Sequence, residues 1–196
     1  VLIGNGDFET PNGANWAFAQ ANGHTVSYPA TGGNPGGHAV INGLAASQTW
    51  FAVLIANNDA PVSLSSLGLQ AGKRYKFSVD MKLLSGSKIG GLKLDWAQGG
   101  STGDKFPTLI GDGSTWQTYN FEFDIPPGTT AFKVVPLWGS NSEVAFDNIR
   151  VESTPVQIIP VVTNGDFETP AGANWAYYTD GFGLTYPTTG GNPGGH

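Results

Sequence analysis

Residues 73–82, KRYKFSVDMK, alternate apolar and polar side chains from Tyr75 onward. Residues 116–125, WQTYNFEFDI, repeat this alternation, with apolar side chains at positions 119, 121, 123 and 125. A period of two residues is typical of antiparallel strands that bury one face against a core and expose the other. Both stretches therefore predict half-buried strands.

The rest of the first 155 residues is also typical of short strands separated by turns. The chain holds 29 glycines and 13 prolines, which leave little room for long helices. No stretch shows a capped helical period of useful length. The predicted fold is all-β, a two-sheet antiparallel β-sandwich of the jelly-roll type. The further expected strands are residues 2–8, 25–28, 38–41, 50–55, 62–64, 91–96, 131–137 and 144–151.

Composition excludes several classes of partner. Charged residues make up only 12% of the chain, the formal net charge is −6, and all nine basic residues fall between Lys73 and Arg150. Binding to nucleic acid or to an anionic membrane surface needs a basic patch, and none is visible. No apolar run approaches the roughly 20 residues that span a bilayer. The absence of cysteine excludes disulfides and thiolate metal sites.

A long internal repeat organises the chain. Residues 5–11, NGDFETP, recur at 164–170, and residues 32–38, GGNPGGH, recur at 190–196. A period near 158 residues is the length of a whole domain. We therefore expect a complete domain over 1–154, a linker over 155–163, and the opening part of a second copy over 164–196. Some thirty residues bury too little surface to fold alone, so this part would be disordered, pack on its own first copy, or dock on neighbouring copies of the same domain.

The order and spacing of five motifs in the first copy resemble carbohydrate-binding modules of the family 4, 9, 16 and 22 type. The resemblance covers essentially the whole first copy and implies a β-sandwich jelly roll that is secreted, has no catalytic activity and binds a polysaccharide. The motifs are NGDFE at residues 5–9 followed by Trp16, a glycine-rich turn before HAV at 38–40, AGKRYKFSV at 71–79, WQTYNFEF at 116–123, and VAFDNIRV at 144–151.

The resemblance also implies a structural calcium ion that ties the first strand to the last. Asp7, Glu9 and Asp147 are the implied metal ligands, completed by backbone carbonyls near Asp7 and in the turn over residues 32–37. Calcium takes six to eight oxygen ligands, so carboxylates from opposite ends of the domain would cross-link them. The alternative is that Asp7 and Glu9 only accept hydrogen bonds in a turn and that Asp147 ends a strand.

A sheet that binds sugars needs exposed aromatic rings beside hydrogen-bonding side chains. The polar candidates lie on the non-core faces of predicted strands, with Lys93 and Asp95 expected to join the others from a neighbouring strand. Trp50 begins a predicted strand and is the tryptophan least expected to be used in core packing, whereas Trp16 and Trp116 look structural. Trp96 and Trp138 share their parity with core residues. The candidate ligand-binding residues are Trp50, Lys76, Asp80, Lys93, Asp95, Asn120 and Trp138.

Two other functions were compared with polysaccharide binding. A glycosidase would need two carboxylates flanking a bond, and four acidic residues on these strands could supply them. No serine-nucleophile, paired-histidine or phosphate-loop motif is present, so we expect no enzyme activity. The second is a structural repeat unit of a secreted fibre or surface adhesion protein, in which residues 164–196 bridge neighbouring units. The four acidic residues that could supply a glycosidase's carboxylates are Asp80, Asp95, Glu122 and Asp124.

Overall fold

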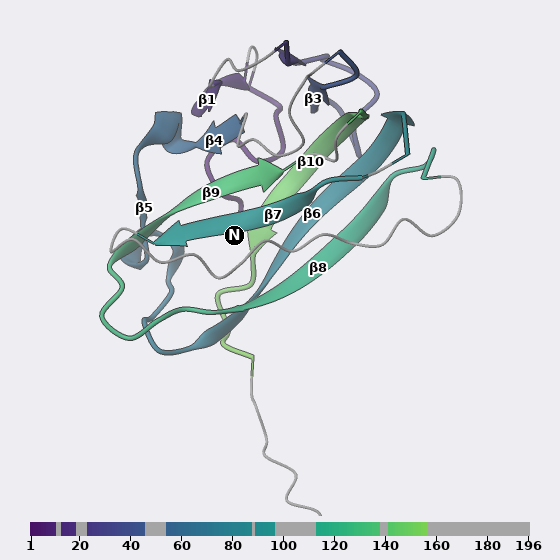
Figure 1. Cartoon of the computed structure of the whole chain (residues 1–196). Helices are drawn as coiled ribbons and strands as arrows, with labels where there is room; N and C mark the ends of the chain where they lie inside the picture. Colours follow the sequence, from purple (N-terminus) through teal and green to yellow (C-terminus); the bar gives the residue numbers. More distant parts are fainter. Residues whose placement is uncertain are drawn as a thin grey trace, which may run out of the picture. The chain divides into compact units, whose positions relative to one another are not determined.

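The computed structural model describes residues 1–10, 13–18, 23–45, 54–87, 89–96, 113–137 and 141–156 (Figure 1). Its contacts divide the chain into two units, Val1–Val156 and Gln157–His196, and every described residue belongs to the first. Trp50, Trp138 and the whole second copy of the repeat lie outside the described residues.

Strands dominate the described part of the chain, which confirms the predicted all-β class. Two short 3-10 helices, η2 (Asn57–Asp59) and η3 (Ser65–Leu67), interrupt them, and no helix among the described residues is long and apolar enough to cross a membrane. The strands are β1 (Trp16–Phe18), β2 (Thr25–Ser27), β3 (Ala39–Asn42), β4 (Leu54–Ala56), β5 (Val62–Ser63), β6 (Arg74–Ser85), β7 (Gly91–Trp96), β8 (Gln117–Asp124), β9 (Ala131–Leu137) and β10 (Glu143–Val151).

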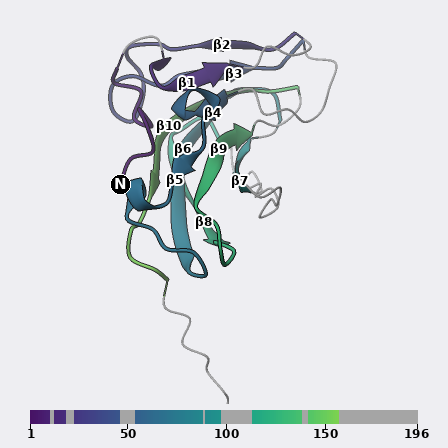
Figure 2. The same cartoon turned by 90° about the vertical axis from the view of Figure 1, so that its left-hand side faces the viewer.

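The strands form two larger sheets and one small one. The larger sheets have the orders β2-β3-β10-β6-β8 and β5-β9-β7, and all their pairings are antiparallel. Figures 1 and 2 show β7 and β9 crossing over β10, β6 and β8, so that the two sheets lie face to face. The pair β1-β4 forms the small sheet. This arrangement confirms the predicted two-sheet β-sandwich.

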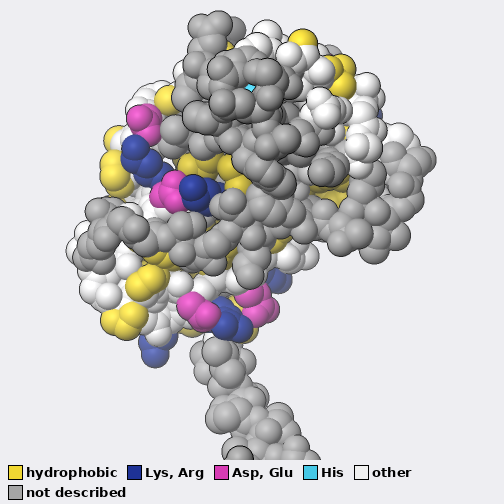
Figure 3. All heavy atoms as spheres, in the orientation of Figure 1, with side chains coloured by type: hydrophobic (Ala, Val, Ile, Leu, Met, Phe, Trp, Pro, Cys, Tyr) yellow, Lys and Arg dark blue, Asp and Glu magenta, His cyan; other side chains and the backbone are white. Residues whose placement is uncertain are grey.

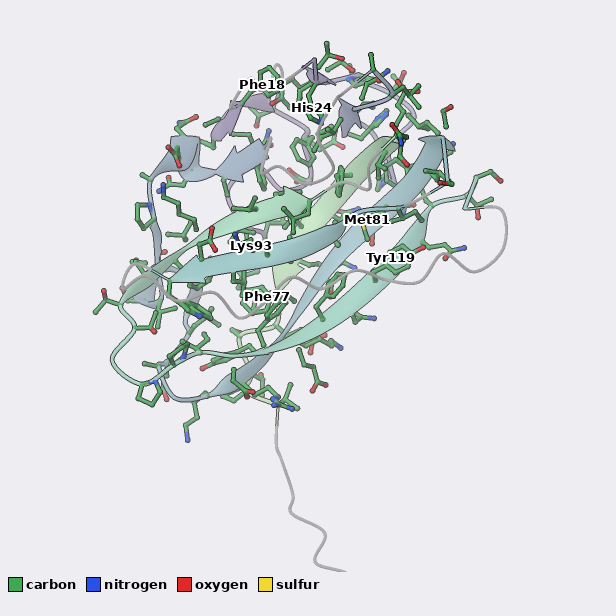
Figure 4. All side chains as sticks on the ribbon, in the orientation of Figure 1. Phe18, His24, Phe77, Met81, Lys93 and Tyr119 are labelled. Atoms are coloured by element: carbon green, nitrogen blue, oxygen red, sulfur yellow. The ribbon has the colours of Figure 1, made fainter. Side chains whose placement is uncertain are left out.

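Aromatic contacts hold the two larger sheets together. Phe77 of β6 meets Phe132 of β9 edge to face at 5.9 Å between ring centroids, and Phe132 meets Trp96 of β7 at 5.4 Å. All three side chains are at most 5% exposed (Phe77 is labelled in Figure 4). Full burial of one such side chain contributes roughly 1.5–3 kcal/mol. Trp96 is therefore a core residue, as its parity predicted.

The start of the chain differs from the prediction. Residues 2–8 form only an isolated bridge, Leu2 to Arg150, although the Ile3 amide also donates to the Ile149 carbonyl at 3.0 Å. The backbone then turns left-handed at Gly4 (φ 61°) and at Phe8 (φ 50°), which ends the extended run. Strand β1 was not predicted, because its three residues, WAF, are all apolar and show no alternation.

Candidate functional site

The solvent side of the five-stranded sheet gathers most of the polar candidates. Asp80 of β6 pairs with Asp147 of β10 on one side and with Thr118 of β8 on the other. Lys82 follows two residues after Asp80 on β6, and Trp116 directly precedes β8. We call this surface the outer face. It comprises Lys76, Ser78, Lys82, Trp116, Thr118, Asn120 and Arg150, with Asp80 and Asp147 buried beneath it.

Asp80 lies beneath this face and holds its neighbours in place. It is 3% exposed, and its Oδ1 accepts a hydrogen bond from the Thr118 hydroxyl at 2.6 Å. Its Oδ2 accepts bonds from the side-chain amides of Asn34 at 3.1 Å and Asn148 at 2.9 Å. The Arg150 guanidinium lies 3.5 Å from Oδ1. Because these partners occupy both oxygens, the carboxylate supports the face from below.

Asp147 is fully buried beside Asp80. Its Oδ2 accepts a hydrogen bond from the Asn34 backbone N–H at 2.6 Å, and its Oδ1 accepts one from Asn148 at 2.7 Å. Burial above all, together with the nearby Asp80 and Glu9 carboxylates, raises the pKa of Asp147 to about 6, against the lowering effect of the two hydrogen bonds. Three carboxylates therefore act on one another at this buried position, and a bound cation would offset the repulsion between them.

The turn over residues 32–37 brings Glu9 to the same place. Glu9 Oε1 accepts a hydrogen bond from the Gly37 N–H at 3.0 Å. Gly36 has φ +79°, and a Cβ there would overlap the Glu9 carboxylate, so only glycine fits. A Cβ at Gly33 would lie 2.8 Å from Asp147 Oδ2 and 2.8 Å from the Gly36 carbonyl. The carboxylates of Glu9 and Asp147 therefore lie beside carbonyl groups of this turn. We call these carboxylates and carbonyls together the carboxylate pocket.

The donors of the carboxylate pocket fit calcium in kind. Calcium prefers hard oxygen ligands, and Glu9, Asp147 and the turn carbonyls supply them. Within the described ranges, no three Asp, Glu or His side chains converge on one point, so carbonyls would have to complete the shell. Among these same residues, N–H groups of the turn bond the carboxylates of Glu9 and Asp147, whereas no such bond reaches the Asp7 carboxylate. The structure thus brings together two of the three predicted metal ligands.

Trp116 places an aromatic ring on the outer face. The residue is half-buried, its indole Nε1 donates to the Gly32 carbonyl at 2.9 Å, and its ring meets His38 edge to face at 5.6 Å. Burial lowers the pKa of His38, and the nearby Lys82 ammonium lowers it further, so both favour the neutral imidazole. Thr118, with the same parity as Trp116, is exposed.

Trp116 was not predicted as a site residue. The signal was present, because position 116 shares its parity with the solvent-facing positions 118 and 120 and not with the core positions 119, 121 and 123. What the alternation could not show is that the glycine-rich turn would hold the indole over the sheet.

The predicted polar candidates divide between two surfaces. Lys76 and Asn120 lie on the outer face, where Lys76 forms an ion pair with Glu152 and Asn120 Oδ1 accepts a hydrogen bond from Ser78 at 2.8 Å. Trp50 and Trp138 lie outside the described residues.

Lys93 and Asp95 do not join the others, which corrects the expectation. They lie on β7 in the three-stranded sheet, with Leu94 between them in the core, and they pair with each other at 3.2 Å. Their side chains therefore point away from the outer face, on the other side of the sandwich (Lys93 is labelled in Figure 4). Figure 3, which views this side, shows acidic and basic side chains next to one another over the described part. Alternation assigns a residue to a face of its strand but does not say which sheet the strand joins.

Comparison with known proteins supports the fold. No family model and no curated protein sequence matches the chain. A solved structure of a family 4 carbohydrate-binding module (CBM4) matches with TM-score 0.52 and 18% identity, covering 79% of this chain and 99% of the other. The CBM22-1–GH10 modules of Clostridium thermocellum xylanase 10B, complexed with xylohexaose, match with TM-score 0.50 and 16% identity, covering 77% of this chain and 28% of the other.

A cyclase has the same fold. The Stig cyclase Fisc from Fischerella sp. TAU matches with TM-score 0.56 and 17% identity, covering 80% of this chain and 99% of the other. At such identities the likeness shows the fold alone. The first unit is therefore a β-sandwich like those of CBM4 and CBM22 modules, and Stig cyclases share this architecture.

Proposed function

We propose that this unit is a secreted carbohydrate-binding module without catalytic activity and that it binds polysaccharide on the outer face. The observation that carries the proposal is the half-exposed Trp116 ring beside the exposed Thr118 and Asn120 on one sheet surface. Sugar rings offer apolar C–H faces that stack on indole and hydroxyls that need polar partners, and this surface supplies both.

The hydrogen bonds within the face leave defined groups for a ligand. The Thr118 hydroxyl donates its proton to Asp80, so its oxygen is left to accept a bond from a sugar hydroxyl. Asn120 Oδ1 accepts from Ser78, so its side-chain N–H groups are left as donors. In this proposal Asp80 positions Thr118 and does not touch the sugar, while Lys76 and Lys82 border the face.

The carboxylates considered for a glycosidase are each held by partners, which supports binding without catalysis. Asp95 pairs with Lys93, Arg74 bonds Asp124 bidentately with contacts of 2.7 and 2.5 Å, and Glu122 lies 3.8 Å from the same guanidinium. Asp80 is buried under its own partners. A glycosidase would need two carboxyl groups facing a substrate across a scissile bond.

The test is a panel of soluble and insoluble polysaccharides, with binding measured by affinity electrophoresis and pull-down. We expect saturable binding to at least one polysaccharide, weakened at least about 5-fold by Trp116→Ala, because loss of one aromatic stacking platform costs on the order of 1–3 kcal/mol where the stacked group is a nucleobase. Phe18→Ala is the matched control, since Phe18 is an aromatic residue 39% exposed on β1, away from the outer face. Equal binding by both variants, or no binding to any polysaccharide, would contradict the proposal.

We also propose that the carboxylate pocket holds one calcium ion, with Glu9 and Asp147 as side-chain ligands. The ion would neutralise two carboxylates that repel each other and would cross-link the start of the chain to β10. The donor set and the glycine positions that admit it support this proposal.

A second candidate function is a structural repeat unit of a fibre or adhesion protein. It is favoured by one observation, the recurrence of NGDFETP and GGNPGGH at a domain-length period. In that case residues 164–196 would bridge neighbouring copies. Light scattering on the full chain and on a chain ending at Val156, where the first unit ends, separates the two functions. Association that grows with concentration and needs residues 164–196, without binding to any polysaccharide, would favour the repeat unit.

A further inference from the structure

We propose that the turn over residues 32–38 couples the carboxylate pocket to the outer face, so that a cation bound at Glu9 and Asp147 positions the Trp116 indole. The inference rests on the proposed function only in treating Trp116 as part of a ligand surface. The contacts that would transmit the effect are within the described residues.

The first route runs through the backbone of the turn. Gly32, at its start, accepts the hydrogen bond from Trp116 Nε1, and His38, at its end, packs against the Trp116 ring. Between them, Gly37 donates to Glu9, and the Asn34 N–H donates to Asp147. Both contacts that orient the indole therefore come from the segment that the two pocket carboxylates hold.

The second route runs through Asn34 and Asn148. Each donates its backbone N–H to one oxygen of Asp147 and its side-chain amide to Asp80 Oδ2. The Asn148 amide also donates to the Asn34 carbonyl. Asp80 in turn accepts the Thr118 hydroxyl. Two asparagines thus link the pocket carboxylate to a carboxylate that supports the outer face.

A cation would change what these groups do. Without one, the oxygens of Glu9 and Asp147 are oriented by N–H groups of the turn. A bound calcium ion would be coordinated by some of those carboxylate oxygens and would draw turn carbonyls toward itself, because it needs six to eight oxygen ligands. The turn must then adjust, and Gly32 and His38 adjust with it. Coupling between sites is typically about 5- to 150-fold in affinity and is reciprocal.

The first experiment uses calcium chloride alone, so it does not depend on any glycan. In ¹⁵N-labelled full-length protein, the six tryptophans give indole N–H signals, and Trp116→Phe identifies the one from Trp116. We expect saturating calcium to shift this signal and to slow its hydrogen exchange at least about 5-fold. The Trp96 indole, in the core between the sheets, is the internal control and should not change. A Trp116 signal that stays unchanged while calorimetry shows calcium bound, or no calcium binding at all, would overturn the coupling.

The second experiment tests reciprocity by calorimetry of calcium binding. Trp116→Phe keeps a ring but deletes the donor to Gly32, and we expect it to weaken calcium binding about 2- to 10-fold, since one hydrogen bond is worth about 0.5–1.5 kcal/mol. Tyr119→Phe is the matched control, because it deletes a hydrogen bond from an aromatic ring on β8 to Gln117, away from the turn. Thermal melts of both variants check that each is folded. Equal calcium affinities for the two variants would contradict the proposal.

The failures of the two proposals are distinguishable. A protein that binds no polysaccharide but shows the calcium-dependent Trp116 signal loses the proposed function and keeps the coupling. A protein that binds polysaccharide through Trp116, with an indole signal that calcium does not move, keeps the function and loses the coupling.

Discussion

At the scale of single residues, Asp147 is ionisable and yet has no exposed surface. Its pKa of about 6 lies above the ordinary value of 3.8, chiefly because burial disfavours the charged form. Between these values the folded state binds the proton more tightly than the unfolded state does. The stabilising contribution of this group is therefore present below pH 3.8 and is lost as the pH rises through 6.

This sign gives a prediction for the calcium-free protein. In chelator, we expect the melting temperature of the wild type, relative to Asp147→Asn, to fall between pH 4 and pH 6.5. In saturating calcium the fall should disappear, because the cation favours the ionised carboxylate. Scanning calorimetry at several pH values measures both effects. A parallel pH dependence of the two proteins in chelator would show that the pKa of Asp147 is not raised.

A second prediction at this scale separates the proposed metal ligands. Calcium at a free concentration 100 times its Kd should raise the free energy of unfolding by about 2.7 kcal/mol. Glu9→Gln should lose most of this gain, because the Glu9 carboxylate reaches the glycine turn. Asp7→Asn should keep it, because among the described residues the Asp7 carboxylate, unlike that of Glu9, accepts no hydrogen bond from the turn. Urea unfolding with and without calcium measures the difference, and the opposite ranking would exchange the assigned roles.

At the scale of elements, the position of β7 decides which charged side chains can meet a ligand. Its pairing with β9 puts Lys93 and Asp95 on the far side of the sandwich from Asn120. We expect Lys93→Ala and Asp95→Ala to leave polysaccharide binding within about twofold, and to change stability by less than about 1 kcal/mol, as is typical of exposed ion pairs. Asn120→Ala, on the outer face, should weaken binding several-fold. If Lys93→Ala weakened binding as much as Asn120→Ala, the assignment of the ligand to the outer face would be wrong.

The strands themselves were largely predictable. The alternation of apolar and polar residues predicted two long strands, and residues 74–85 and 117–124 form them as β6 and β8. In β6, the odd-numbered residues from Tyr75 to Met81 face the core. The opening segment was not predictable in the same way. Its apolar residues suggested a strand, but Gly4 and Phe8 adopt left-handed backbone conformations that only the packing against β10 reveals.

At the scale of the whole molecule, the outer face and the carboxylate pocket both contact the turn over residues 32–38. The start of the chain, the turn over residues 32–38 and β10 come from three distant parts of the sequence, and Asp147 and Glu9 meet at that turn. If the turn couples the two sites, calcium should raise the affinity for a polysaccharide, and the polysaccharide should raise the affinity for calcium by the same factor. Titrations of each ligand in the presence and absence of the other measure both factors, and unequal factors would show that the two effects are not linked.

Patterns along the chain predicted the class of fold, the face of each long strand that is buried, and the turn rich in glycine. These features are local, because side-chain alternation and backbone freedom are properties of neighbouring residues. Three other features became visible only in the folded protein: β7 joins the second sheet, Asp80 is buried under its partners, and Gly32 holds Trp116 over the outer face. These features depend on contacts between distant residues, from Trp96 and Phe132, 36 positions apart, to Gly32 and Trp116, 84 positions apart, which no local pattern encodes.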